Sequence, residues 1–190
     1  MKYDIVLAGV GGQGVLSLAV AIASGAMEEK LHVKQAEVHG MAQRGGAVMS
    51  TLRLSDREIA SDLIPRGGAS MILSMEPMES LRYLSFLSPG GSLITSVNPV
   101  RNIPDYPDLE GLLGCIRMLP RGVMIDAEKL AREAGSARAT NMVMVGAATH
   151  LLPIRVETVE NAVRSIFARK GEKVVDVNLR ALRAGREAAR

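Results

Sequence analysis

The chain holds one cysteine, Cys115, among its 190 residues, and it has no tryptophan. A single thiol can form neither a disulfide within the chain nor a thiolate zinc site, and it cannot ligate an iron–sulfur cluster. Aromatic residues make up only 3% of the sequence, whereas surfaces that bind single-stranded nucleic acid hold the bases on aromatic rings. We therefore expect no nucleic-acid partner, and any electron transfer through clusters must take place in another chain.

Histidine is also scarce, and the chain lacks a hydrophobic run long enough to cross a membrane. The three histidines are scattered, and His39 has no nucleophile and carboxylate arranged with it, so we predict no metal site and assign no catalytic residue. The apolar stretch 15–26 follows a glycine-rich turn and is too short to span a bilayer. These absences predict a cytoplasmic protein with no membrane partner.

Aliphatic side chains are abundant instead. Hydrophobic residues make up 47% of the chain, including 11 methionines, and the length suffices to bury a sizeable core in one domain, 1–190. The net charge is +3, with a cluster of arginines near the end of the chain that forms either a solvated helix face or a docking surface. These arginines are Arg180, Arg183, Arg186 and Arg190.

Periodicity and turn signals predict an α/β fold, a three-layer α/β/α Rossmann-like domain with a mostly parallel, mixed sheet. The sheet is expected to be mixed because a turn at 55–57, followed by a short antiparallel strand at 58–60, indicates a hairpin. The helix at 13–29 is apolar around most of its circumference, which predicts that it is covered on both sides. Strands are expected at 3–8, 32–38, 47–54, 69–75, 92–97 and 121–125. Helices are expected at 13–29, 76–87, 126–134, 140–152, 156–170 and 178–190. The segment 98–107 carries three prolines and is expected to form an irregular excursion or an inter-subunit loop.

A glycine-rich turn joins the first predicted strand to the first predicted helix. Glycines permit a tight turn and let a ligand or another chain approach bare backbone, and the following helix N-terminus favours an anion. A purely structural turn is the alternative. The candidate contacts in this turn are Gly9, Gly11, Gly12, Gln13 and Gly14.

A second loop, 39–46, follows the second predicted strand and is expected at the same edge of the sheet. Arg44 could pair with a phosphate or carboxylate, and Gly45 and Gly46 would let backbone amides approach the same anion. Alternatively, Arg44 forms a salt bridge with Glu37. Glu37 also stands where a nicotinamide dinucleotide fold places its ribose-binding carboxylate.

Three motifs together resemble a known family. They are the turn Gly9-Val10-Gly11-Gly12-Gln13-Gly14, the run from Glu37 through Arg44-Gly45-Gly46, and Asn141-Met142-Val143-Met144-Val145-Gly146-Ala147. With these motifs the chain resembles the small subunits of indolepyruvate:ferredoxin oxidoreductases, in the gamma-domain group of 2-oxoacid:ferredoxin oxidoreductases. The residues before Arg44-Gly45-Gly46 favour the aryl-pyruvate branch.

The resemblance implies a complex that oxidatively decarboxylates aryl 2-oxoacids, with coenzyme A accepting the acyl group and ferredoxin the electrons. It places thiamine diphosphate and the iron–sulfur clusters on a large partner subunit, so that the isolated chain is inactive. This chain would assist assembly or coenzyme A binding, through the glycine turn, the segment from Arg44 to Gly46, and Asn141.

Other functions stay open at this point. One is the gamma subunit of a pyruvate- or 2-oxoglutarate-type ferredoxin oxidoreductase. Another is a free-standing NAD(P)-binding dehydrogenase, suggested by the glycine turn and Glu37. The third is a nucleotide-sensing or scaffolding protein.

Overall fold

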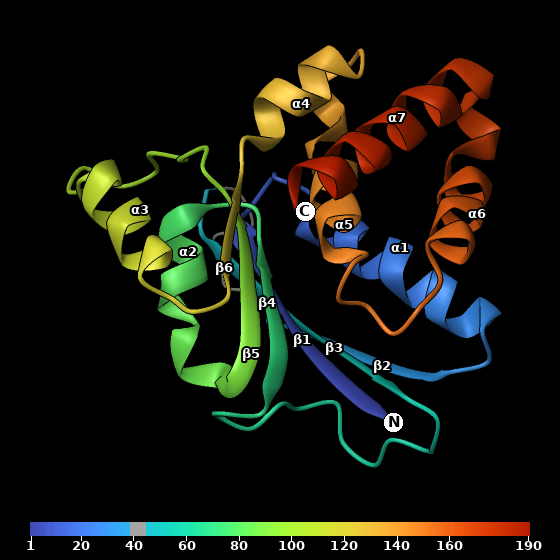
Figure 1. Cartoon of the computed structure of the whole chain (residues 1–190), viewed down its shortest axis with the longest axis horizontal. Coiled ribbons are helices and arrows are strands. Elements are labelled where there is room, and N and C mark those ends of the chain that lie inside the picture. Colours follow the sequence, from blue (N-terminus) through green and yellow to red (C-terminus); the bar gives the residue numbers. More distant parts are fainter. Residues whose placement is uncertain (39–44) are drawn as a thin grey trace.

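The computed structural model describes residues 1–38 and 45–190, which form a six-stranded sheet between two layers of helices (Figure 1). The strands are β1 (Lys2–Val10), β2 (His32–Val38), β3 (Ala47–Ser55), β4 (Ala69–Ser74), β5 (Leu87–Ser96) and β6 (Gly122–Ile125). The helices are α1 (Val15–Glu28), α2 (Pro77–Arg82), α3 (Leu109–Arg117), α4 (Ala127–Glu133), α5 (Thr140–Ala148), α6 (Val156–Phe167) and α7 (Glu172–Ala188). Figure 1 places α2 and α3 on one face of the sheet and the other helices on the opposite face, which confirms the three-layer prediction.

The sheet is mixed because β3 runs against its neighbours. The strand order is β2-β3-β1-β4-β5-β6, with β3 antiparallel to both β2 and β1 and the remaining pairs parallel. The predicted mostly parallel, mixed sheet is therefore confirmed, but the hairpin predicted at 55–60 is wrong. Both edges of β3 are already paired, so a return strand has no edge to bind. Instead, the Arg53 guanidinium donates to the carbonyl oxygens of Ser61 (2.8 Å) and Leu63 (2.9 Å) and holds this segment as a loop.

Alternate residues of the central strands face opposite helix layers. Ile5 and Leu7 of β1 are fully buried in the larger core, which also includes residues of α1, α5, α6 and α7. Val6 between them is fully buried in the smaller core, together with Leu113 and Ile116 of α3. The two-residue period of a strand thus supplies both faces of the sheet with apolar side chains.

One face of α1 is exposed, which corrects the expectation that this helix is covered on both sides. Leu16, Val20 and Met27 are 39%, 45% and 65% exposed. Packing within the chain therefore explains only part of the apolar pattern of α1. Among the described residues, no helix combines the length and the apolar character needed to cross a membrane.

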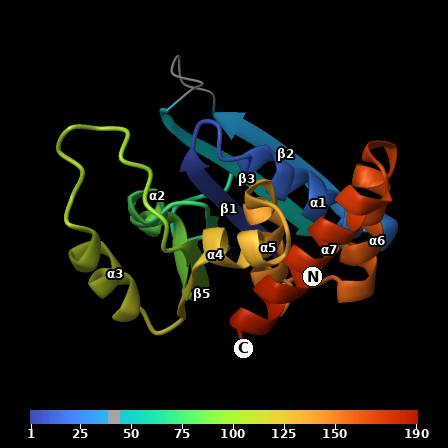
Figure 2. The same cartoon turned by 90° about the horizontal axis from the view of Figure 1, so that it is seen from above.

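Several boundaries differ from the sequence prediction. The sequence reasoning missed α3, which Asp108 caps by accepting a hydrogen bond from the Gly111 N–H at 2.8 Å. Helix α7 begins at Glu172 and not at residue 178 as predicted. It follows directly after Gly171, whose φ of 92° ends the preceding turn. The predicted irregular excursion lies between β5 and α3, and Figure 2 shows it as a wide loop.

Candidate functional site

The glycine turn lies between β1 and α1, as predicted. Gly12 and Gly14 have φ values of 103° and 81°, a left-handed region that L side chains rarely adopt. Gly9 is required for a different reason, since a Cβ there would lie 2.8 Å from Cγ2 of Val15 and 3.1 Å from Cβ of Met75. The turn therefore brings α1 close to the ends of β1 and β4.

The two glycine loops lie side by side. The Gly11 N–H donates to the Gly46 carbonyl at 2.8 Å, and the Gly45 N–H donates to the Gly11 carbonyl at 3.2 Å. These bonds continue the antiparallel ladder that pairs Val10 with Ala47. The meeting of the two loops predicted from the topology is thus found, but both backbone groups of Gly11 are used within the chain. Arg44 and His39 lie outside the described residues.

The side chain of Gln13 joins the turn to the neighbouring strand. Its Oε1 accepts a hydrogen bond from the Val10 N–H at 2.7 Å, and its Nε2 donates to the Met75 carbonyl at 3.2 Å. Met75 follows β4, so this amide bridges the adjacent carboxyl ends of two parallel strands. Gln13 is therefore a positioning residue for the turn.

A first hollow, which we name the carboxyl-end hollow, opens beside Gln13 and has a volume of about 290 Å³. Its walls come from the ends of β4 and β5, from α4 and from the start of α5. Gln13 follows β1 and Met75 follows β4, and these neighbouring strands lead to α1 and α2 on opposite faces of the sheet. Open α/β sheets bind ligands at such a position, outside the carboxyl ends of the strands. Two charged side chains line this hollow, Arg132 and Glu128, and they pair with each other at 3.3 Å.

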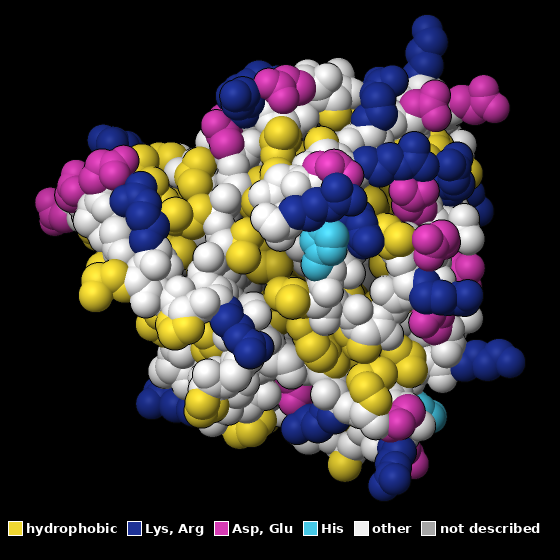
Figure 3. Space-filling model, viewed as in Figure 1, with side chains coloured by type: hydrophobic (Ala, Val, Ile, Leu, Met, Phe, Trp, Pro, Cys, Tyr) yellow, Lys and Arg dark blue, Asp and Glu magenta, His cyan; other side chains and the backbone are white. Residues whose placement is uncertain are grey.

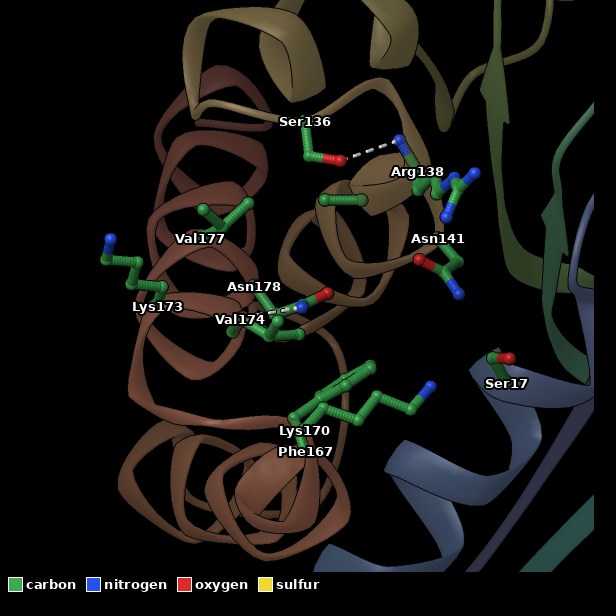
Figure 4. Close-up of a pocket in the computed structure, with 11 residues that line it drawn as sticks. Ser17, Ser136, Arg138, Asn141, Phe167, Lys170, Lys173, Val174, Val177 and Asn178 are labelled. Carbon is green, nitrogen blue, oxygen red and sulfur yellow. Dashed lines mark hydrogen bonds between the residues drawn. The ribbon is translucent and has the colours of Figure 1, made fainter.

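A second and larger hollow, which we name the Asn141 hollow, lies against the first turn of α1 and has a volume of about 490 Å³. Asn141 and Ser17 both line it (Figure 4). A Cβ on Gly14 would lie 3.4 Å from Nδ2 of Asn141, so this amide stands directly beside the glycine turn. The structure thus brings Asn141 together with the first motif, although the two are far apart in the sequence.

Two side chains of the loop between β5 and α3 bind it to residues beside the glycine turn and β4. Asn102 Nδ2 donates to the Gly45 carbonyl at 2.6 Å, and the Tyr106 hydroxyl donates to Oε1 of the buried Glu76. Oε2 of Glu76 also accepts from the Glu79 N–H at 2.8 Å and so caps α2. Burial raises the pKa of Glu76, and burial together with the bond to Glu76 raises the pKa of Tyr106.

Sequence reasoning missed Glu76 and Tyr106, which belong to different segments and meet only in the fold. The sequence did hold a local signal for Glu76 as a helix cap, because it precedes Pro77, and proline is favoured in the first turn of a helix.

Glu37 does not lie where a dinucleotide-binding fold requires it. It pairs with Ser50 of β3, and Ser50 pairs in turn with Leu7 of β1, so a whole strand separates Glu37 from the strand that carries the glycine turn. A ribose-binding carboxylate lies on the strand next to that turn. The geometry therefore removes the main support for a free-standing nicotinamide dehydrogenase.

The arginines of α7 are engaged within the chain. Arg183 makes two hydrogen bonds of 2.7 Å to Glu160, Arg180 donates to the Ala134 carbonyl, and Arg186 donates to Thr149. Figure 3 shows basic and acidic side chains interleaved over the region of α6 and α7. Of the two readings of this cluster, the structure favours a helix face paired within the chain.

Within residues 1–38 and 45–190, no group of three or more His, Cys, Asp or Glu side chains could hold a metal ion. The polar side chains beside Gly14 of the glycine turn are the Asn141 amide and the Ser17 hydroxyl, 3.4 Å and 3.7 Å from a Cβ built on that glycine. This chemistry suits the binding of an anion.

Comparison with known proteins extends this picture over nearly the whole chain. Residues 4–188 match the family model described as pyruvate ferredoxin/flavodoxin oxidoreductase. The indolepyruvate oxidoreductase subunit IorB of Archaeoglobus fulgidus is 39% identical over 194 residues, which cover 97% of this chain and 94% of that protein.

Solved structures show the same fold. The keto/oxoacid ferredoxin oxidoreductase gamma subunit from Geobacter sulfurreducens has a TM-score of 0.72 at 25% identity, covering 98% of both chains. The 2-oxoglutarate:ferredoxin oxidoreductase from Magnetococcus marinus, solved with 2-oxoglutarate, coenzyme A and succinyl-CoA bound, has a TM-score of 0.77 at 25% identity. That match covers 99% of this chain but only 31% of the Magnetococcus chain.

Proposed function

The chain belongs to the pyruvate ferredoxin/flavodoxin oxidoreductase family, and from that membership we propose that it is the small subunit of a complex acting on aryl 2-oxoacids such as indolepyruvate. The complex cleaves carbon dioxide from the 2-oxoacid, joins the acyl carbon to the thiol of coenzyme A and passes the released electrons to ferredoxin. Thiamine diphosphate would supply the decarboxylation chemistry, and it and the clusters would reside on a large partner subunit.

Within that complex this chain helps to hold the acyl acceptor. The observation that carries this role is a hollow of about 490 Å³ beside the first turn of α1, lined by Ser17 and Asn141, in which the Asn141 amide stands next to Gly14 of the glycine turn. Ligand pockets usually have volumes of this order, and coenzyme A carries phosphates that suit a helix N-terminus. The Magnetococcus relative, whose structure contains coenzyme A, supports the choice of ligand.

The candidate residues divide between contact and support. Among the described residues, the proposed contacts are Gly12, Gly14 and Asn141. Arg44, which lies outside the described residues, remains a proposed contact from the sequence. Gly9, Gly11, Gln13, Gly45 and Gly46 shape the turn and hold the two loops together.

The exposed face of α1 is the proposed docking surface for the large subunit. Leu16, Val20 and Met27 share one face of α1, and no Asp, Glu, Lys or Arg precedes Glu28 in this helix. The match covers only 31% of the Magnetococcus chain, so in that protein the matching domain is part of a much longer polypeptide. We assign the α1 face to contact with the large subunit, which would correspond to the rest of the Magnetococcus polypeptide. A contiguous exposed apolar surface is typical of a protein–protein interface.

Co-expression with the large subunit tests the proposal. The pair should reduce ferredoxin only when an aryl pyruvate and coenzyme A are both present, and each chain alone should be inactive. The same assay with 2-oxoglutarate and pyruvate identifies the substrate class, because the proposal expects the highest kcat/KM for indolepyruvate. Full activity of the large subunit alone would refute the proposed role.

A further inference from the structure

Glu76 stands where three parts of the molecule meet. It follows β4 closely, is buried, and caps α2 through its side chain. Its Oε1 accepts a hydrogen bond from the Tyr106 hydroxyl, and its Oε2 accepts one from the Glu79 N–H at 2.8 Å. The Val100 N–H also interacts with this carboxylate and lowers its pKa, although burial raises that pKa by more. Donors of this kind compensate a buried carboxylate for the water that it has lost.

One loop carries both of the donors that reach Glu76 from outside α2. Val100 and Tyr106 belong to the segment between β5 and α3, residues 97–108, which we name the β5–α3 loop. Between these two residues, the Asn102 N–H donates to the Val100 carbonyl at 2.8 Å and closes a three-residue turn. Glu76 therefore holds the loop on both sides of Asn102 and fixes where that side chain lies.

The same loop holds the second glycine loop in place. Asn102 Nδ2 donates to the Gly45 carbonyl at 2.6 Å, and the Gly45 N–H donates to the Gly11 carbonyl at 3.2 Å. Gly45 has a φ of 76°, and a Cβ built on it would meet no atom of the described residues within 4 Å. Within the described part of the chain, hydrogen bonds and not side-chain packing thus fix the position of Gly45.

Glu76 is joined to the glycine turn from the other side as well. Met75, the residue before it, accepts a hydrogen bond from Gln13 Nε2 at 3.2 Å. The contacts therefore form a closed ring, which leads from Glu76 through the β5–α3 loop to Gly45 and Gly11 and returns through Gln13. In a closed network each bond restricts the geometry of the next, so the loss of one bond is felt at the others.

We propose that Glu76 is a positioning residue for the glycine turn, which it holds against the second glycine loop through Tyr106 and Asn102. The Glu76 carboxylate is not itself a ligand contact, because it is buried and both of its oxygens already accept hydrogen bonds. That the positioned turn serves the acyl acceptor rests on the proposed function above. The coupling between Glu76 and Gly45 does not depend on that function.

Amide hydrogen exchange of the full chain tests the coupling. Tyr106→Phe removes the hydroxyl that binds Glu76, and Asn102→Asp keeps the shape of the side chain but removes the donor to Gly45. Each variant should speed exchange at the Gly11 and Gly45 N–H groups by about fivefold or more. Because both substitutions break the same connection, the double variant should exchange within about twofold of the faster single variant.

Tyr83→Phe is the matched control. Tyr83 is half-buried like Tyr106, but its ring packs near Phe86 and its hydroxyl forms no hydrogen bond within the described residues. This variant should change exchange at the two glycine amides by less than about twofold. Glu76→Gln leaves one acceptor oxygen and should speed exchange at the same amides. It also weakens the cap of α2, so Tyr106→Phe is the variant that decides.

Kinetics of the complex separates positioning from a general loss of stability. Tyr106→Phe and Asn102→Asp should raise the KM for coenzyme A by about threefold or more, and should leave kcat and the KM for the 2-oxoacid within about twofold. Unchanged exchange at Gly11 and Gly45, or additive effects in the double variant, would overturn the proposal. Faster exchange with an unchanged KM for coenzyme A would support the coupling and overturn only the assignment of this turn to the acyl acceptor.

Discussion

Gly146 of α5 and Gly185 of α7 allow two helix backbones to touch. A Cβ on Gly146 would lie 1.8 Å from the carbonyl oxygen of Leu182, and a Cβ on Gly185 would lie 1.9 Å from the carbonyl oxygen of Val143. Each glycine thus packs on the backbone one turn before the other glycine. This contact sets α7 against α5, and both helices supply walls of the Asn141 hollow.

Gly146→Ala should destabilise the protein by about 1–3 kcal/mol, because the added methyl group must push the helices apart. Gly114→Ala in α3 is the matched control, since a Cβ there would meet no atom within 4 Å. That control should be neutral or stabilising by up to about 1 kcal/mol. Urea unfolding of both variants measures the difference, and equal stability would show that the α5 and α7 contact yields easily.

Gln13→Leu should cost about 1–3 kcal/mol of unfolding free energy, because it leaves the Val10 N–H and the Met75 carbonyl without their partner. Gln13→Glu keeps an acceptor for the Val10 N–H but places a carboxylate oxygen against the Met75 carbonyl, so it should also be less stable than the wild type. Gln35→Leu on the exposed edge strand is the control and should change stability by less than about 0.5 kcal/mol. A Gln13→Leu variant as stable as the wild type would argue against the bridging role.

Asn141→Asp should raise the KM of the complex for coenzyme A while leaving the KM for the 2-oxoacid unchanged. The substitution keeps the shape of the side chain but places a negative charge beside Gly14, where the proposal puts a phosphate. Loss of one hydrogen bond to a charged group predicts an increase of about tenfold or more. Asn161→Asp on the exposed face of α6 adds the same charge away from the hollow and serves as the control. A larger effect on the 2-oxoacid would place Asn141 in a substrate site instead.

Val20→Glu should weaken assembly with the large subunit without unfolding the chain. Val20 is 45% exposed at the centre of the apolar α1 face, and a carboxylate there would lose its solvation on docking. Met118→Glu, 85% exposed after α3 on the opposite side of the sheet, should leave assembly unchanged. Co-purification and thermal unfolding distinguish the two effects, and equal recovery of the complex with both variants would rule out α1 as the docking face.

The Glu160 and Arg183 pair should make stability depend on pH in the acid range. The hydrogen bond from Arg183 lowers the pKa of Glu160 below its ordinary value of 4.5. The stabilisation is therefore complete above that value and is lost as the pH falls through the lower pKa of the folded state.

Because the Arg183 side chain is 56% exposed, we expect a contribution of only about 0.5–1 kcal/mol. Glu160→Gln should be less stable than wild type near neutral pH, and the difference should shrink at about pH 3. Glu133→Gln, at the exposed end of α4, should show no such change. A constant difference at both pH values would mean that the charge of Glu160 does not carry the effect.

Local patterns in the sequence determined much of the fold. The strand at His32–Val38 matches the predicted span, because its flanking turn signals are local. The turn at Gly9–Gly14 was located for the same reason, since its positive φ values exclude most other residues. The family motifs also lie within short segments, so they could be recognised without a structure.

Only the tertiary structure decided how these pieces meet. The order of the strands placed β3 beside β1, which joined Gly11 to Gly46 and separated Glu37 from the glycine turn. The Asn141 hollow also depends on the fold, because its lining residues come from segments far apart in the sequence. Pairing between strands and the approach of α7 to α5 are long-range packing events, and neither residue period nor turn chemistry encodes them.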